Sequence, residues 1–235
     1  MKINGYDISG CNARQHAFTP GHLEVNTNSE WITGAVLPYF EVSHVNMKSF
    51  TVTLIVKGAS REEIIRNRSD LLAKLLDVVD LELDGFSTKF RAIMTKHSES
   101  EISMRRWHKL EISFEGYEYG DQISASGTSS VAVNNPGNVV SPCIVELTPT
   151  MGVPEIHLTG ICRDRFTGED MPVTIEDLVT GQTVILDGIT GLITENGELK
   201  EVEAWELPTM NPGANTVTCD SDKIAITIKT LPLYM

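Results

Sequence analysis

The sequence has few aromatic residues and no long apolar run. Aromatic side chains make up 6% of the 235 residues. No stretch approaches the roughly 20 apolar residues that a membrane-spanning helix needs. Residues 1–7 lack the basic segment followed by an apolar segment that is typical of a secretory signal peptide. We therefore expect no membrane insertion, and a protein that is made and kept in a reducing cytosol.

Cysteine is also scarce and its four residues are scattered. Cys11, Cys143, Cys162 and Cys219 form no Cys-x-x-Cys pair, and none has a histidine at metal-ligand spacing. This pattern predicts buried free thiols. A disulfide among the last three cysteines is the alternative.

Positive charge is short in the second half of the chain. The net charge is -13, from 19 basic and 32 acidic residues. Residues 1–125 contain 14 basic and 17 acidic residues, whereas residues 126–235 contain 5 and 15. A surface that grips DNA needs cations to displace counterions, so specific nucleic-acid binding is not expected. The acidic surface could let a polyanion pass without sticking, or serve solubility alone.

A composition change predicts two domains. Residues 124–130 and 134–138 are small, polar and rich in turn formers. We therefore expect an N-terminal domain over residues 1–122, a linker over 123–140 and a C-terminal domain over 141–235. At this size each domain can bury a core of its own.

The N-terminal half predicts an α+β domain. Residues 50–56 read as a strand, and Ser60 can cap a helix while Glu63 reaches back to the cap nitrogen. Asp84–Gly85 between apolar runs indicates a hairpin, and residues 107–114 a further strand. Antiparallel strands with one long helix are therefore expected. The apolar face of that helix has these residues: Ile64, Ile65, Leu71, Leu72, Leu75, Leu76 and Val79.

The C-terminal half predicts short strands separated by turns, which favours a β-sandwich or a jelly roll. Residues 224–228 alternate cleanly between apolar and other side chains. Pro212–Gly213 suits a type II turn, since proline presets φ and glycine tolerates a positive φ. We expect this turn to form a hairpin corner before a strand with Val217 and Cys219 on one face. The expected strands cover residues 144–147, 156–159, 173–175, 184–186, 202–207, 216–219 and 224–228.

Enzyme motifs are missing. The sequence has no GxSxG, Walker A, GxGxxG or HExxH pattern. We therefore predict that the protein is not an enzyme, with no catalytic, cofactor-binding or metal-binding residue. The dispersed histidines are expected to be structural or exposed: His16, His22, His44, His97, His108 and His157.

Two acidic clusters are candidates for a metal site or a catalytic pair. Residues 164–170 place three acids near a glycine, as calcium sites do, but without the DxDxDG spacing; an ordinary acidic turn is favoured. Glu195, Glu198, Glu201 and Glu203 surround Asn196–Gly197 and could pair for glycoside hydrolysis. A charged hairpin tip that blunts edge pairing is the favoured reading.

Two further motifs concern sugars. Residues 67–69 form a glycosylation triplet, but it lies inside the expected helix of a chain without a signal peptide. Five aromatic residues could form a sugar-stacking platform, although core positions are favoured for the tryptophans. They are Trp31, Trp107, Trp205, Tyr117 and Tyr119.

Nearly the whole chain resembles the distal tail proteins of siphovirus-type phages and of prophages in Gram-positive bacteria. In the first half the resemblance rests on residues 50–56, the capped helix from Ser60, residues 81–85 and residues 112–117. In the second half it rests on residues 135–138, 141–146, 184–188 and 207–215. These are patterns of strands and turns rather than catalytic fingerprints.

The resemblance implies a fold and a role. Its fold is an α+β domain in a six-fold ring followed by an outward galectin-like β-sandwich. Its role is a structural virion protein at the tip of a long non-contractile tail, assembled in the host cytoplasm. The implied partners are the protein itself, the tail tube protein, the tape measure protein, and a tail-associated lysin or receptor-binding protein. The alternative is a carbohydrate-binding module that recognises cell-wall sugars through the C-terminal sandwich.

Overall fold

Extended backbone dominates the computed structural model. It describes residues 1–21, 28–31, 33–34, 36–37, 39–41, 47–101, 106–164, 167–204 and 206–235. Strands account for 57% and helix for 8% of the structure, and the strands form several antiparallel sheets. The prediction of an α+β domain followed by a galectin-like β-sandwich was therefore wrong, because the fold is nearly all-β. The predicted helix is present, but it contains only 13 residues, fewer than the surrounding strands contain together.

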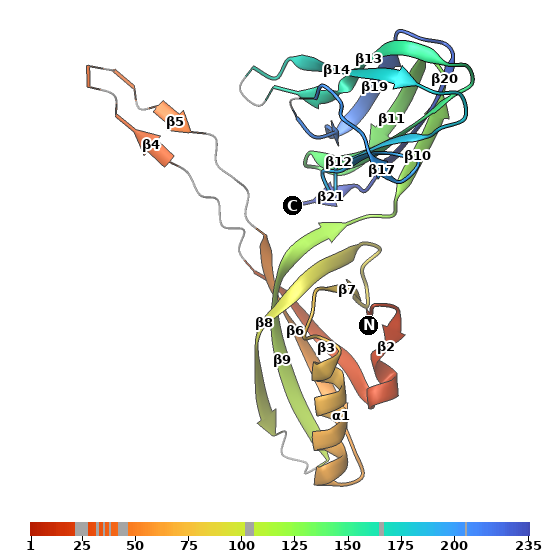
Figure 1. The fold of residues 1–235 in the computed structure, drawn as a ribbon. Helices are drawn as coiled ribbons and strands as arrows, with labels where there is room; N and C mark the ends of the chain where they lie inside the picture. Colours follow the sequence, from red (N-terminus) through yellow and green to blue (C-terminus); the bar gives the residue numbers. More distant parts are fainter. Residues whose placement is uncertain are drawn as a thin grey trace. The chain divides into compact units, whose positions relative to one another are not determined.

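The chain divides into two compact units. The first comprises residues 1–118 with Met235, and the second comprises residues 119–234. Figure 1 colours the chain from the first unit in red to the second in blue. Within the range predicted as a linker, residues form two strands, β10 (Ile123–Gly127) and β11 (Ser130–Asn135). Both strands pair along their whole length, β10 with residues 226–230 and β11 with residues 213–218.

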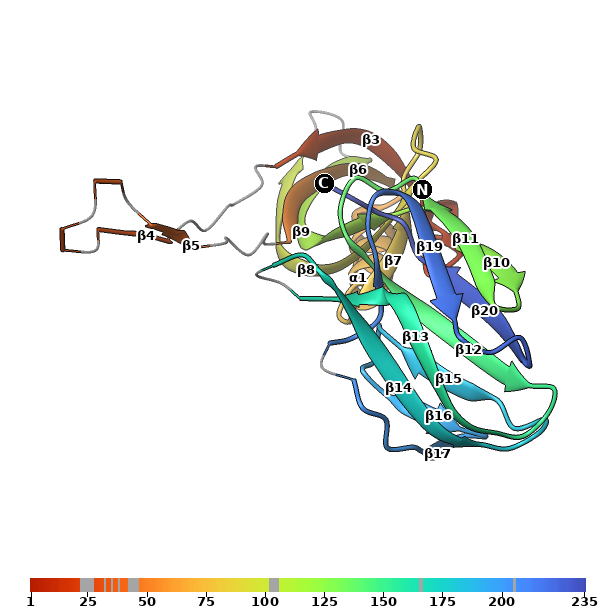
Figure 2. The ribbon, with the colours of Figure 1, turned by 90° about the horizontal axis from the view of Figure 1, so that it is seen from above.

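A curved sheet builds the first unit, in the strand order β2-β1-β7-β8-β9-β6-β3. Figure 2 shows the curvature of β3, β6 and β9. The register places Phe50 opposite Phe114 and Lys57 opposite Trp107. Alternate residues of these strands face one core because successive side chains point to opposite faces. The strands are β1 (Lys2–Ile3), β2 (Tyr6–Asp7), β3 (Ala13–Pro20), β6 (Lys48–Lys57), β7 (Val79–Glu82), β8 (Lys89–Glu101) and β9 (Trp107–Tyr119), with a short 3-10 helix η1 (Ile8–Cys11).

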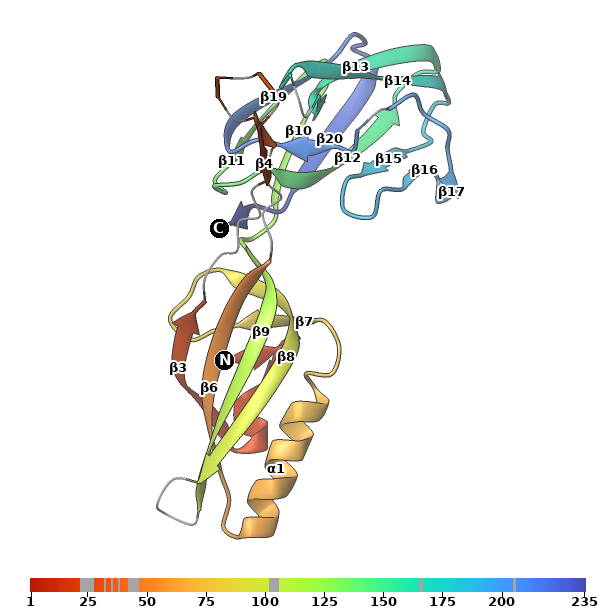
Figure 3. The same ribbon diagram turned by 90° about the vertical axis from the view of Figure 1, so that its left-hand side faces the viewer.

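The helix α1 (Arg61–Ala73) packs on one face of this sheet (Figure 3). Ser60 caps it as predicted, since the Ser60 hydroxyl accepts a 3.2 Å hydrogen bond from the Glu63 nitrogen. The Glu63 carboxylate accepts from the nitrogen of Ala59, one residue before the expected cap nitrogen. The helix ends at Ala73, so Leu76 leaves the apolar face and is 69% exposed.

Two sheets that share one core build the second unit. One has the order β10-β20-β12-β15-β16-β17, with β18 beside β12, and the other has the order β11-β19-β13-β14. Figure 3 shows them as two layers. The core between them is aliphatic. The remaining strands are β12 (Ser141–Pro149), β13 (Val153–Arg163), β14 (Asp170–Leu178), β15 (Val184–Asp187), β16 (Ile193–Glu195), β17 (Glu198–Leu199), β18 (Thr209–Met210), β19 (Gly213–Cys219), β20 (Ile224–Thr230) and β21 (Leu233–Tyr234).

The Pro212–Gly213 turn is a corner between the two sheets rather than a hairpin. Gly213 has a φ of 85°, as the predicted type II turn requires. The strand before the turn, β18, pairs with β12, whereas the strand after it, β19, pairs with β11 and β13. The side chain of Asn215 holds the corner through hydrogen bonds with the backbone of Asn211 and Gly213 at 2.7–3.1 Å.

The cysteine prediction is confirmed, because all four thiols are free and buried. Burial raises the pKa of the Cys143 thiol to about 12 and that of Cys162 to about 11. Both thiols are therefore protonated and poorly nucleophilic near neutral pH. No helix in the described residues has the length and apolar character needed to span a membrane.

Candidate functional site

The phenylalanines of this aromatic-poor chain gather in one place. Every phenylalanine whose side chain the structure describes belongs to a single cluster in the first unit. The rings of Phe18 and Phe86 lie edge to face with centroids 4.8 Å apart, and those of Phe50 and Phe90 lie 5.0 Å apart. We call Phe18, Phe50, Phe86, Phe90 and Phe114 the phenylalanine cluster.

Strand register brings this cluster together. Phe18 lies opposite Val52 on β6, and Phe50 lies opposite Phe114 on β9, so three neighbouring strands present rings to the same face. Phe90 comes from β8, on the other side of β9. Phe86 follows the predicted Asp84–Gly85 turn, at which Gly85 has a φ of 88°. These ring contacts join positions up to 72 residues apart in sequence, since Phe18 contacts Phe90.

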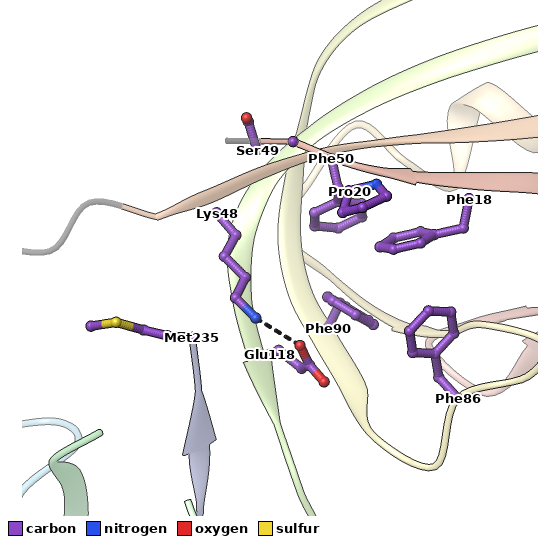
Figure 4. A pocket seen from close by; sticks show the side chains of 10 residues that line it. Phe18, Pro20, Lys48, Ser49, Phe50, Phe86, Phe90, Glu118 and Met235 are labelled. Atoms are coloured by element: carbon purple, nitrogen blue, oxygen red, sulfur yellow. Dashed lines mark hydrogen bonds and ion pairs between the residues drawn. The ribbon is translucent and has the colours of Figure 1, made fainter. Parts of the chain in front are cut away.

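A pocket of about 580 Å³ opens beside the cluster (Figure 4). Its apolar walls include Phe18, Pro20 and the 42% exposed Phe86. At its rim the Lys48 Nζ lies 2.7 Å from the Glu118 carboxylate, which also accepts a 2.7 Å hydrogen bond from the Thr88 hydroxyl. Each oxygen of the Glu118 carboxylate thus has a partner, and the Lys48 ammonium balances its charge. The pocket therefore suits an apolar group of a ligand or partner rather than acid–base chemistry.

A small hairpin follows β3 in the sequence and exposes apolar side chains. Strands β4 (Asn28–Glu30) and β5 (Tyr39–Glu41) pair only with each other among the described residues. The exposed fractions of Trp31, Val36 and Leu37 are 68%, 90% and 76%. An isolated two-stranded hairpin is marginally stable in water. Its exposed apolar residues therefore favour a contact with another surface.

In the acidic turn at residues 164–170, Asp164 and Asp170 bind nearby residues of the same chain segment. The Asp164 carboxylate accepts a 2.8 Å hydrogen bond from the nitrogen of Thr167, and Asp170 pairs with Arg163 at 2.8 Å. Arg165 and Phe166 lie outside the described residues. In the part of the chain that the structure describes, no group of three potential ligands is arranged to hold a metal ion.

The glutamates around Asn196–Gly197 lie on a turn and have different local partners. Glu195 and Glu198 face each other across the turn, where Asn196 and Gly197 have φ values of 49° and 90°. Glu195 is paired with Lys200 at 3.0 Å. Glu203 instead bridges to β14 through its backbone. The cluster thus decorates a tight turn and the chain that follows it.

His157 is the histidine with the most developed polar environment in the described residues. Its Nδ1 lies 2.8 Å from Asp220 and its Nε2 lies 2.9 Å from Glu155. The hydrogen bond with Asp220 is the main cause that raises the pKa of His157, and both carboxylates add to it. Burial opposes ionisation of Asp220, but hydrogen bonds from the backbone and ring of His157 outweigh it and lower its pKa. His22 and His44 lie outside the described residues.

The proposed aromatic platform is not assembled in the described residues. Trp107 and Tyr117 stand ten residues apart on β9, about 33 Å at ~3.3 Å per residue. Cations already lie against the Trp107 ring, with the Lys57 Nζ 4.1 Å and the Arg14 Cζ 5.5 Å from its centroid. Trp205 lies outside the described residues. Asn67 of the glycosylation triplet donates a 2.9 Å hydrogen bond to the Lys57 carbonyl within the folded unit.

Sequence reasoning missed the phenylalanine cluster and the exposed hairpin. Phe18 lies in a stretch without clear alternation, and Phe86 lies in a turn, so neither belonged to an expected strand. The sequence nonetheless contains a signal that predicts the phenylalanine cluster. Phe50 and Phe114 occupy expected strands, and Phe90 lies in an apolar run beside the expected Asp84–Gly85 hairpin. Their concentration in one half of an aromatic-poor chain indicates a shared location.

Comparison with solved structures identifies the fold. The Dit protein of phage SPP1 aligns over 100% of this chain and 98% of its own, with a TM-score of 0.77 and 13% sequence identity. The chain has the Dit fold. The SPP1 protein is described as a paradigm of the hub adsorption apparatus in phages that infect Gram-positive bacteria. The expected likeness to phage distal tail proteins is thus confirmed in the fold.

Other comparisons add little. Two structures of the phage P2 baseplate in its activated conformation, with Ca and with Sr, align at 9% identity and TM-scores of 0.49 and 0.48. They cover 97% and 95% of this chain and 92% of the baseplate chains. No family model and no curated protein matches the sequence.

Proposed function

We propose that this protein is a structural component of a phage tail: the hub ring at the distal end of a long, non-contractile tail. The observation that carries the proposal is the alignment of the whole chain with the SPP1 hub protein at a TM-score of 0.77. Because both chains are covered almost completely, the likeness includes both compact units. At 13% identity the likeness is one of fold, so the role needs its own test.

The first unit has features that suit a ring. Strand β3 is the last strand of its sheet, and an open sheet edge can pair with another chain. Contacts between different surfaces of successive copies close into a ring when the rotation allows. The exposed apolar side chains of the β4–β5 hairpin offer a second contact of this kind. These features support self-assembly, and the six-fold number comes from the family resemblance alone.

In this role the protein joins the tail tube to the tail-associated lysin or receptor-binding protein, with the tape measure protein as a further neighbour. It belongs at the tail tip of the virion and is assembled in the cytoplasm of the bacterial host. Its role is structural rather than enzymatic. The pocket beside the phenylalanine cluster, which we call the phenylalanine pocket, is a candidate contact for an apolar group of one of these partners.

The test is assembly. The purified chain, alone and mixed with the tube and lysin proteins encoded beside it, is examined by light scattering after size exclusion and by negative-stain microscopy. A hexamer of 25.9 kDa chains has a mass of about 155 kDa. We expect rings with a central opening. A chain that stays monomeric and joins neither partner at any concentration would sink the proposal.

A further inference from the structure

A cationic surface stands out on this acidic chain. Strands β3, β6 and β9 place Arg14, Lys57 and Trp107 side by side, because Lys57 is paired with Trp107 and Arg14 lies on the strand next to Lys57. Arg106 precedes Trp107 and is exposed. We call Arg14, Lys57, Arg106 and Trp107 the Trp107 patch.

Two of the three cations of the patch lie against an aromatic ring rather than against carboxylates. The Lys57 Nζ and the Arg14 Cζ lie 4.1 and 5.5 Å from the centroid of the Trp107 ring. Cation–π contacts position a charge without neutralising it. Within the described residues, the ion pairs of the first unit use other cations, namely Lys2, Lys48, Arg68 and Lys109 with the N-terminal amine. The charge of the patch therefore remains available to a partner.

A polar pocket of about 300 Å³ adjoins the patch. Lys57, Arg106 and Trp107 form part of its wall, together with Asn12 and Glu63. The Glu63 carboxylate already accepts a 2.8 Å hydrogen bond from the Ala59 nitrogen. The pocket has room for one or two side chains, and two cations and the Trp107 side chain line it. A carboxylate side chain fits this combination of charge, hydrogen-bond donors and size.

The charges of the whole chain decide which acidic partner fits best. A nucleic acid requires a row of cations along its backbone, and it would meet a chain of net charge -13 with an acid, Glu63, in the pocket wall. Residues 126–235 contain 15 acidic and 5 basic residues. We infer that the Trp107 patch binds an acidic segment from the second unit of another copy of this chain.

This contact deepens the proposed function, on which it rests, by naming one interface between copies. Two copies of charge -13 repel each other, so association needs a local attraction that outweighs the repulsion. A basic patch on one unit and an acidic surface on the other provide it. The two surfaces differ, so the contact is head to tail and suits a ring. Because opposite charges carry it, rising salt weakens it.

Zero-length cross-linking tests the contact directly. A carbodiimide joins a lysine amine to a carboxylate with loss of water, and equal amounts of unlabelled and ¹⁵N-labelled chains separate links between copies from links within one copy. We expect mixed-isotope peptides that join Lys57 to acids within residues 119–234. Lys109, which is paired with Glu111 at the same end of β9, is the matched control and should link mainly within its own copy. Lys57 links that are absent or confined to one copy contradict the inference.

Charge reversal separates this inference from the proposed function. We expect Lys57→Glu to weaken self-association by about tenfold in sedimentation experiments, while Lys96→Glu, at another exposed lysine, leaves it unchanged. Circular dichroism establishes that both variants fold. If rings still form with the tail partners and Lys57→Glu leaves self-association intact, the contact is wrong and the hub role stands. Binding of duplex DNA at physiological salt that Lys57→Glu abolishes would assign the patch to nucleic acid instead and overturn the inference.

Discussion

The two units fill their hydrophobic cores with different kinds of side chain. The first unit fills its core with phenylalanine rings as well as aliphatic residues. Among the described residues, the buried core of the second unit contains only aliphatic residues, methionine and cysteine. Large rigid rings leave an irregular surface where strands end, and the phenylalanine pocket lies there. Small branched side chains between two sheets interdigitate closely. The comparison shows a pocket beside the aromatic core of the first unit, whereas residues 126–235 carry most of the net negative charge of the chain.

Removing a buried ring is expected to have the largest effect on this comparison. Phe90→Ala deletes a ring that is 2% exposed and contacts three other rings, and should destabilise the first unit by about 3–5 kcal/mol. Hydrogen exchange followed by mass spectrometry in mild denaturant resolves the two units. Protection should fall in residues 1–118 and persist in 119–234. Equal losses in both units would show that they unfold as one, and Phe86→Ala, at a 42% exposed ring, is the milder control.

The second-largest effect is expected from a substitution at the Pro212–Gly213 corner of the second unit. Asn215→Ala removes three side-chain hydrogen bonds with Asn211 and Gly213 at a residue that is 8% exposed. Loss of these partly buried hydrogen bonds should cost about 1–3 kcal/mol in total. Urea titration should show that loss in the second unit. Asn134→Ala on β11 changes an exposed asparagine and should have little effect; an equal loss there would mean that the corner is not special.

The helix cap should give a smaller change, confined to the first unit. Ser60→Ala deletes the hydroxyl that accepts from the Glu63 nitrogen and should lower stability by about 1 kcal/mol. Thermal unfolding measured by circular dichroism is sufficient to detect it. Ser69→Ala, at an exposed position inside the same helix, should instead be neutral or slightly stabilising. The opposite order of the two variants would refute the assigned cap.

The smallest expected effect is a pH dependence of the second unit. The folded pKa of His157 is raised by Asp220, so its ion pairs stabilise fully below the ordinary histidine pKa of 6.5 and are lost as pH rises through the folded value. The lowered pKa of Asp220 means that its contribution fades again in acid. His157→Gln should therefore reduce stability slightly at pH 5.5–6.5 and leave it unchanged at pH 8–9, in paired urea titrations. A deficit that grows with pH would contradict these directions.

Local chemistry predicted much of this fold, and long-range pairing accounts for what was missed. The cap at Ser60 and the turn at Gly213 were found because each depends on two to four neighbouring residues. The strands that pair on either side of that turn were not predicted, because β18 and β19 pair with residues up to 88 positions away in sequence. Leu76 was assigned to the buried face since its spacing continues the helix, but the backbone leaves the helix at Ala73.

The candidate site depended on the same distant pairing. Each phenylalanine alone resembles an ordinary core residue, and only the strand order β8-β9-β6-β3 makes them one cluster. The α+β class was wrong because one strong helical pattern outweighed strands whose alternation is weak, such as β3 and β10. The resemblance to tail proteins pointed to the fold that the comparison with SPP1 Dit supports, although the α+β and galectin-like classes that it implied were wrong.

The pairing of β10 with β20 has a consequence for how the chain is made. Ile123 lies opposite Thr230, so the first strand of the second unit finds its partner only after about one hundred further residues have been synthesised. The strands of the first unit, β2-β1-β7-β8-β9-β6-β3, all lie within residues 2–119. On the ribosome the first unit can therefore fold while the strands of the second wait unpaired. We expect early copies to expose the surfaces of the first unit before their second units have formed.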